Sequence, residues 1–231
     1  MKNIGIVVAM EEEGLEIINL MEKIEEKEID GLKFFIGEIE NKRCILVQSG
    51  VGKVNAARTT QVLIYKFDVE MILNIGSAGA INDELNIGDV IIGKYIVQHD
   101  FDITAFDHTK GYITGIGDNV ACSDKIINKI EDIVNKNKEE NYKVKIGIIA
   151  TGDVFLTDLN KKKIIREEFN ADVIDMESGA IAQVAYLNKI PFGAIRSVSD
   201  TPNGNNASTF DENLKLASKR AAKLLKEYLK D

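Results

Sequence analysis

Acidic and hydroxyl side chains follow several short apolar runs of the sequence, and these positions could do chemistry. They are Glu11-Glu12-Glu13, Gly76-Ser77-Ala78-Gly79, Asp175-Met176-Glu177 and Arg196-Ser197-Val198-Ser199-Asp200. Each group also has an ordinary explanation. Acids at a helix start complement the helix dipole, and Asp200 could start a turn at Thr201-Pro202. The glycine segment could be a tight turn or a set of donors for a sugar hydroxyl, a water or an anion.

The acids Asp175 and Glu177 are the hardest of these to explain structurally. Both follow the hydrophobic pair Val173-Ile174, where the start of a helix needs a single capping residue. Asp175 or Ser178 could be that cap. Glu177 is then left without a structural reason, which favours a functional one.

Short β-rich apolar runs alternate with helical patterns, which predicts an α/β fold with a largely parallel or mixed sheet. The expected strands are residues 4–9, 32–39, 44–48, 71–75, 89–98, 146–150, 173–176 and 192–198, and the expected helices are residues 15–26, 54–65, 124–141 and 214–229. Ligands of open α/β sheets bind at the carboxyl ends of the strands. We therefore expect the acids and the glycine segment to meet there.

The organisation of the chain is simple. Its 231 residues are 45% hydrophobic, which is enough to bury a substantial core. Only Pro191 and Pro202 occur, and no stretch rich in proline, glycine or serine divides the chain. We expect a single domain over residues 1–231.

Charge and apolar patterning narrow the classes of partner. The formal net charge is −8 and the basic residues are scattered, which argues against nucleic acid or an anionic membrane. No apolar run approaches the ~18 residues of a membrane helix. The run from Ile4 to Met10 is short and acids follow it at once, unlike a signal peptide. Cys44 and Cys122 lack the spacing of a zinc site or disulfide framework, so we expect a reduced cytoplasmic protein.

Further motifs complete an ordered set along the chain. They are Ile4-Gly5-Ile6 leading to Ala9-Met10-Glu11-Glu12-Glu13, Ser49-Gly50-Val51-Gly52-Lys53, Asn74-Ile75-Gly76-Ser77-Ala78-Gly79, His99-Asp100 with Thr104-Ala105-Phe106, Thr151-Gly152-Asp153-Val154-Phe155, Met176-Glu177, and Arg196 to Asp200 followed by Phe210-Asp211. The set resembles the nucleoside phosphorylase and nucleosidase superfamily, and within it the methylthioadenosine/S-adenosylhomocysteine nucleosidases. The resemblance extends over nearly the whole chain.

The resemblance implies a three-layer α/β/α sandwich with a central mixed β-sheet, and hydrolysis of the N-glycosidic bond of a 5'-thioadenosine nucleoside. It implies that Glu13 activates a water and that Asp200 delivers a proton to purine N7. Glu177 would hold the ribose hydroxyls, while Arg196 and Ser77 would orient the water. These side chains would stabilise the charges that develop as the glycosidic bond breaks, which are positive on the ribose and negative on the departing purine.

The resemblance also implies substrate contacts. Ser199 would fix Asp200, Met176 would lie beneath the ribose, and Asp175 would belong to the same site. Adenine would stack on Phe155 and be read by main-chain groups of Phe155 and Leu156. An apolar channel for the 5' substituent would be lined by Met10, Val51 and Phe210, with Ile103 and Phe106 contributed by the neighbouring subunit of a homodimer. We expect neither a metal nor a cofactor.

Some positions depart from the family pattern. Asp175 stands where the family usually has Glu, and the shorter side chain would retract its carboxylate from a partner. Gly179 follows Ser178 where Ala and Thr are common in the family. Gly204-Asn205-Asn206 lies in the polar loop of residues 201–209, which we expect to act as a lid. These changes leave the acid, the base and the ribose carboxylate in place.

Two other functions compete with hydrolysis. A nucleoside phosphorylase of the same superfamily would use phosphate in place of water, but it would carry an Arg shortly before the Gly-Ser turn, where this chain has Asn74. With Arg196 already assigned, the few arginines make a phosphate clamp hard to assemble. A non-catalytic nucleoside-binding protein is the other alternative, and retention of all three acids argues against it.

Overall fold

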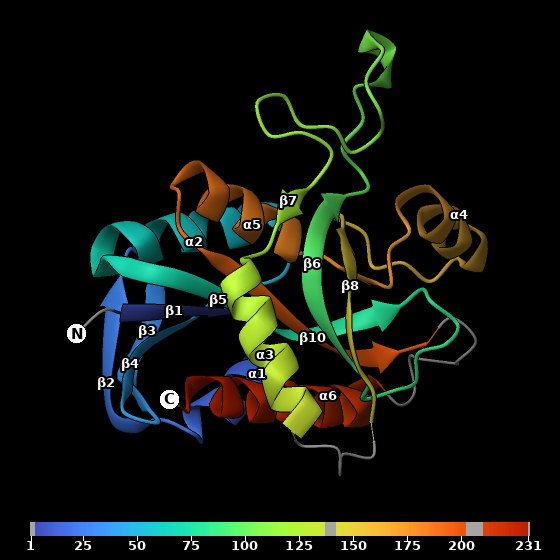
Figure 1. The fold of residues 1–231 in the computed structure, drawn as a ribbon. Coiled ribbons are helices and arrows are strands. Elements are labelled where there is room, and N and C mark those ends of the chain that lie inside the picture. Colours follow the sequence, from blue (N-terminus) through green and yellow to red (C-terminus); the bar gives the residue numbers. More distant parts are fainter. Residues whose placement is uncertain (1–2, 137–141, 202–209, 231) are drawn as a thin grey trace.

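The apolar runs form the strands of one mixed sheet in the computed structural model, which describes residues 3–136, 142–201 and 210–230 (Figure 1). The strands are β1 (Asn3–Val8), β2 (Glu22–Ile29), β3 (Leu32–Ile39), β4 (Lys42–Gln48), β5 (Val69–Ala80), β6 (Val90–Gln98), β7 (Val120–Ala121), β8 (Val144–Thr151), β9 (Val173–Asp175) and β10 (Phe192–Asp200). The helices are α1 (Glu11–Ile18), α2 (Lys53–Phe67), α3 (Asp124–Lys136), α4 (Leu159–Phe169), α5 (Ser178–Leu187) and α6 (Phe210–Leu229), with a short 3₁₀ turn, η1 (Thr104–Phe106).

Helices cover both faces of the sheet. On one face α2 packs against α5, and on the other α6 packs against α1, β5 and β10 (Figure 1). This is the expected α/β fold with a central mixed sheet and helices on either side, so the predicted fold class is confirmed.

The strand order brings distant segments of the chain together. Strand β1 lies between β4 and β5 and runs parallel to both. Beyond it, β5 pairs with β10, β10 with β6, β6 with β8, β8 with β9, and β9 again with β5, which closes a circuit of strands. The circuit was not expected from the sequence. It places the carboxyl ends of β5, β9 and β10 beside one another.

The expected helix at residues 15–26 is wrong beyond its first part. Helix α1 ends at Ile18, and the following charged segment is the edge strand β2, paired antiparallel with β3. Every residue of β2 before Ile29 is exposed, so its charges are solvated and can occupy a sheet edge. The helical spacing of its few isoleucines was therefore misleading.

Other expected elements agree with the structure to within a few residues. Helix α3 buries Ile126, Ile127 and Ile130, as its amphipathic pattern predicts, and the end of the predicted helix, residues 137–141, lies outside the described residues. Helices α4 and α5 were not predicted as elements. Among the described residues, no helix is long and apolar enough to cross a membrane.

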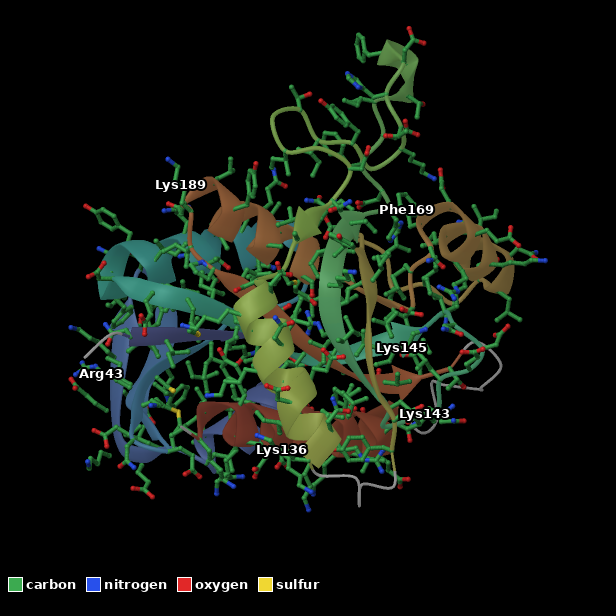
Figure 2. The ribbon with its side chains drawn as sticks, viewed as in Figure 1. Arg43, Lys136, Lys143, Lys145, Phe169 and Lys189 are labelled. Atoms are coloured by element: carbon green, nitrogen blue, oxygen red, sulfur yellow. The ribbon has the colours of Figure 1, made fainter. Side chains whose placement is uncertain are left out.

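Residues 99–119, between β6 and β7, project away from the rest of the protein as an arm that carries η1 near its tip (Figure 1). Basic side chains are spread over the surface rather than gathered: Figure 2 labels Arg43 on β4, Lys136 at the end of α3, Lys143 before β8 and Lys189 after α5. All four are exposed. Their spread agrees with the scattered basic residues of the sequence.

Candidate active site

A cavity lies where β1, β5, β9 and β10 end, and most of the predicted site residues line it. Those that do are Met10, Glu13, Val51, Ser77, Phe155, Leu156, Asp175, Met176, Glu177, Ser199 and Asp200. Ala9, Ala78, Gly79, Val154 and Ile174, for which no individual site role was expected, line it as well. The site is thus assembled from strand ends, as expected for this class of fold.

Glu13 is the buried member of the three acids at the start of α1. Glu11 and Glu12 are exposed, whereas Glu13 is only 2% exposed. Its Oε2 accepts hydrogen bonds from the backbone N–H groups of Ala9 (2.9 Å) and Met10 (3.1 Å). Its Oε1 accepts from the backbone N–H (2.8 Å) and the hydroxyl (3.0 Å) of Ser77. These donors fix the carboxylate between β1 and β5.

The segment Gly76 to Gly79 is part of strand β5 and is not a tight turn. Its glycines are needed because other groups approach the backbone closely. A Cβ at Gly76 would lie 2.5 Å from both Glu13 Oε1 and Arg196 Nη1, and one at Gly79 would lie 2.8 Å from Asp200 Oδ2. The donors of Ser77 serve Glu13.

Arg196 is fully buried and, among the described residues, is the largest side chain to be so. Its Nη2 lies 2.8 Å from Asp175 Oδ2 and donates to Asn74 Oδ1 at 2.7 Å. The Ser178 hydroxyl lies 3.1 Å from the same nitrogen. No described residue accepts a hydrogen bond from Nη1. Arg196 therefore has one free donor, beside Gly76.

Asp175 is fully engaged despite its short side chain. Its Oδ2 meets Arg196, and its Oδ1 accepts from the Thr151 hydroxyl at 2.6 Å and the Ser178 N–H at 3.3 Å. The expected retraction of this carboxylate from a partner is therefore wrong, because the guanidinium of Arg196 lies within reach. Because Gly179 has no Cβ, the side chains of Gln98 and Thr151 can lie close to its backbone.

Glu177 occupies the cap position of α5, but its side chain makes no capping hydrogen bond. Its Oε1 instead accepts from the Gly52 N–H at 3.0 Å, and its Oε2 lies 3.7 Å from Arg196 Nη2. Gly52 has φ +98°, a conformation that favours glycine. Burial and the neighbouring Asp175 carboxylate raise the pKa of Glu177 to about 7, although Arg196 opposes this rise.

Asp200 is the last residue of β10 and is 5% exposed, so it belongs to the strand and the cavity wall. The Ser199 hydroxyl donates to its Oδ1 at 3.0 Å. Its Oδ2 meets Lys162 Nζ at 3.4 Å. Lys162 was missed by sequence reasoning, although it shares the buried side of α4 with Ile165, three residues later.

The rim of the cavity is apolar and open. Phe155 is 59% exposed and Val51 is 48% exposed although both line the cavity, whereas Leu156 is buried. A ligand in the cavity could cover these two exposed side chains, and burial of such apolar surface is favourable.

Three other predicted site residues do not line this cavity: Arg196, which adjoins it at Gly76, and Ile103 and Phe106. Ile103 and Phe106 lie on the arm, where Phe106 is 75% exposed. This is compatible with their expected place at a neighbouring subunit's site. The side chain of Phe210 lies outside the described part of the structure, as does the expected lid beyond Thr201.

Comparisons with known proteins show which family the chain is similar to. The sequence profile of the phosphorylase superfamily matches residues 3–230. The chain is 40% identical over 228 residues to the 5'-methylthioadenosine/S-adenosylhomocysteine nucleosidase of Staphylococcus carnosus, covering 98% of this chain and 99% of that protein.

Solved structures are similar over the same length. The 5'-methylthioadenosine/S-adenosylhomocysteine nucleosidase of Neisseria meningitidis in complex with methylthio-immucillin-A gives a TM-score of 0.93 at 33% identity, covering 100% of this chain and 99% of that chain. The futalosine hydrolase of Helicobacter pylori gives a TM-score of 0.92 at 32% identity, covering 98% of this chain and 97% of that chain.

Proposed function

Because the chain belongs to the phosphorylase superfamily and, within it, to the 5'-methylthioadenosine/S-adenosylhomocysteine nucleosidases, we propose that it hydrolyses the N-glycosidic bond of these two nucleosides. The products are adenine and the 5'-thioribose sugar. The oxygen of a water molecule forms a bond to the ribose carbon, while the bond between that carbon and the purine nitrogen breaks. The water gives up one proton, and the purine receives one at N7.

Glu13 acts as the base that takes the proton from water. The observation that carries this assignment is the convergence of Glu13 Oε1 and Arg196 Nη1 at Gly76, beside the cavity that Glu13 lines. The carboxylate accepts protons, and the free Nη1 donor beside it can hold the water oxygen. Rotation of the Ser77 hydroxyl away from Oε1 leaves that oxygen open to the water proton.

Asp200 acts as the acid that protonates the leaving purine. Glu13 lies over Gly76 and Asp200 over Gly79 of the same strand. Three residues of extended strand span about 10 Å. This separation leaves room for a nucleoside between base and acid, so that water can attack from the face opposite the purine. Ser199 holds Oδ1 of Asp200.

Glu177 and Met176 hold the ribose. Both line the middle of the cavity wall, between β9 and α5. The Glu177 carboxylate accepts hydrogen bonds from the ribose hydroxyls and lies near the positive charge that develops on the sugar. Asp175 supports it indirectly, because Asp175 anchors Arg196 through a buried ion pair.

The apolar rim binds the rest of the nucleoside. Phe155 stacks on adenine, and main-chain groups of Phe155 and Leu156 read the base edge. Met10 and Val51 contact the 5'-thio substituent, together with Phe210. Ile103 and Phe106 reach the same channel from a second subunit, because they stand on a projecting arm with Phe106 exposed. The active form is therefore a homodimer.

Phosphate does not replace water in this proposal. Arg196, whose guanidinium adjoins the cavity, has only Nη1 free of partners in the described part of the chain, because its Nη2 is paired with Asp175 and Asn74, and Lys162 meets Asp200 on the purine side. Several free donors are needed to bind phosphate.

Adenine release by the purified protein tests the function. The substrates are methylthioadenosine, S-adenosylhomocysteine, adenosine and a futalosine-type nucleoside, each with and without phosphate. Free sugar and no effect of phosphate are expected. Ribose 1-phosphate as the product would instead identify a phosphorylase, and binding without turnover would identify a non-catalytic protein.

Two variants separate the acid from the base. Asp200→Asn should nearly abolish adenine release and spare activity on a nitrophenyl riboside, whose leaving group needs no proton. Glu13→Gln should impair both substrates, because both need the same water. Each carboxylate is expected to contribute about 10²-fold or more in kcat. An Asp200→Asn variant that stays fully active on methylthioadenosine would overturn the assignment.

A further inference from the structure

Lys162 is the buried member of three consecutive lysines. It lies between Lys161 and Lys163 in α4, and both neighbours are exposed. Lys162 itself is 3% exposed. A buried ammonium needs a charged or hydrogen-bonding partner, because burial removes its hydration. The position of that partner therefore indicates what Lys162 does.

The partner is Asp200. Lys162 Nζ lies 3.4 Å from Asp200 Oδ2, and both side chains are buried. Asp200 lines the cavity, whereas Lys162 does not. The ammonium thus meets the carboxyl without being part of the cavity wall, while the Ser199 hydroxyl holds Oδ1. Both oxygens of Asp200 are held by donors, which fixes how the carboxyl faces the cavity.

We infer that Lys162 is a positioning residue that holds the leaving-group acid Asp200 in the orientation that faces the purine. This inference rests on the proposed function, because it assumes that Asp200 protonates the purine. Without Lys162, Oδ2 of Asp200 would lose its donor, and the carboxyl group could turn away from the leaving purine.

The test is kcat for methylthioadenosine in wild type and in Lys162→Met, whose side chain keeps most of the lysine stem. In the variant kcat should fall by about 10-fold or more, because a general acid contributes about 10²-fold or more only when it is correctly placed. Lys162→Arg, which keeps a donor, should restore most of the activity, and Lys161→Met, which removes an exposed neighbour, should have no effect.

A nitrophenyl riboside provides the second readout. Its leaving group needs no proton, so Lys162→Met should leave kcat for this substrate unchanged. An equal loss of activity on both substrates would overturn the inference, since it would mean that Lys162 only supports packing.

Folding of the variants is checked by thermal unfolding. If Lys162→Met does not fold, Lys162→Gln makes the same comparison with a polar uncharged head. Failure of the proposed function is seen separately, because wild type would then release no adenine at any pH. A wild type that releases adenine, with a kcat for methylthioadenosine that neither uncharged variant lowers, would refute the role of Lys162 alone.

Discussion

Replacing Glu177 with glutamine should stabilise the folded protein above neutral pH while it impairs catalysis. The reason is that Glu177 is buried beside Asp175, and these surroundings raise its pKa from an ordinary 4.5 to about 7. Glutamine has the same shape and stays neutral at every pH. Its carbonyl oxygen can still accept the hydrogen bond that the Gly52 N–H donates to Glu177 at 3.0 Å.

The magnitude follows from the pKa of Glu177. A pKa that is higher in the folded than in the unfolded protein means that the folded state binds the proton more tightly. Stability from this group is fully present below about pH 4.5 and is lost as pH rises through about 7. The total loss is about 3 kcal/mol, at about 1.4 kcal/mol for each pH unit between the two pKa values. Glu177→Gln does not suffer this loss.

Urea unfolding at fixed protein concentration measures the effect. The free energy of unfolding is compared between wild type and Glu177→Gln at about pH 5 and about pH 8. The variant's advantage should grow by about 2.5 kcal/mol over this interval. Glu12→Gln, which changes an exposed acid, is the matched control and should show no such growth.

The catalytic half of this prediction is measured on the same preparations. An amide cannot balance the positive charge on the ribose as a carboxylate does, so kcat/KM for methylthioadenosine should fall by about 10²-fold or more. An advantage that stays constant within about 1 kcal/mol from about pH 5 to about pH 8 would refute the reasoning, because burial would then not keep a proton on Glu177.

Other substitutions test the site and the assembly. Gly76→Ala should cost about 1–3 kcal/mol of stability and most of the activity, since its Cβ would lie 2.5 Å from both Glu13 and Arg196; a fully active variant would contradict this close approach. Phe106→Ala should raise KM more than it lowers Tm, and wild type should be a dimer by light scattering at micromolar concentration; a fully active monomer would contradict the shared channel. Phe210→Ala should raise KM for 5'-thioalkyl nucleosides more than for adenosine, and equal effects on both substrates would instead indicate a core residue.

Much of the site could be predicted from the sequence because the relevant signals are local. An apolar run followed by an acid indicates a strand end, and strand ends meet at one side of an α/β sheet. This reasoning predicts that Glu13, Glu177 and Asp200 lie together, and all three line one cavity. The ordered motifs of a known family added the roles, which remain proposals for each residue.

Tertiary structure decided the features that depend on contacts between distant segments. Gly76 and Gly79 were compatible with a turn, but they lie in β5, where side chains from α1 and β10 approach its backbone closely. The segment Glu22–Ile29 had helical spacing, but pairing with β3 makes it an edge strand. Pairing energy of this kind overrides local preference.

The ionisable groups of the site show the same distinction between what local sequence predicts and what tertiary structure decides. The sequence by itself determined which ionisable groups stand at the strand ends, because their positions follow from local patterns of apolar and polar residues. Only the folded structure decided their partners: Arg196 pairs with Asp175, and Lys162, one of three consecutive lysines, is buried against Asp200. Desolvation and Coulomb interactions depend on distance in space, and neither can be calculated from spacing along the chain.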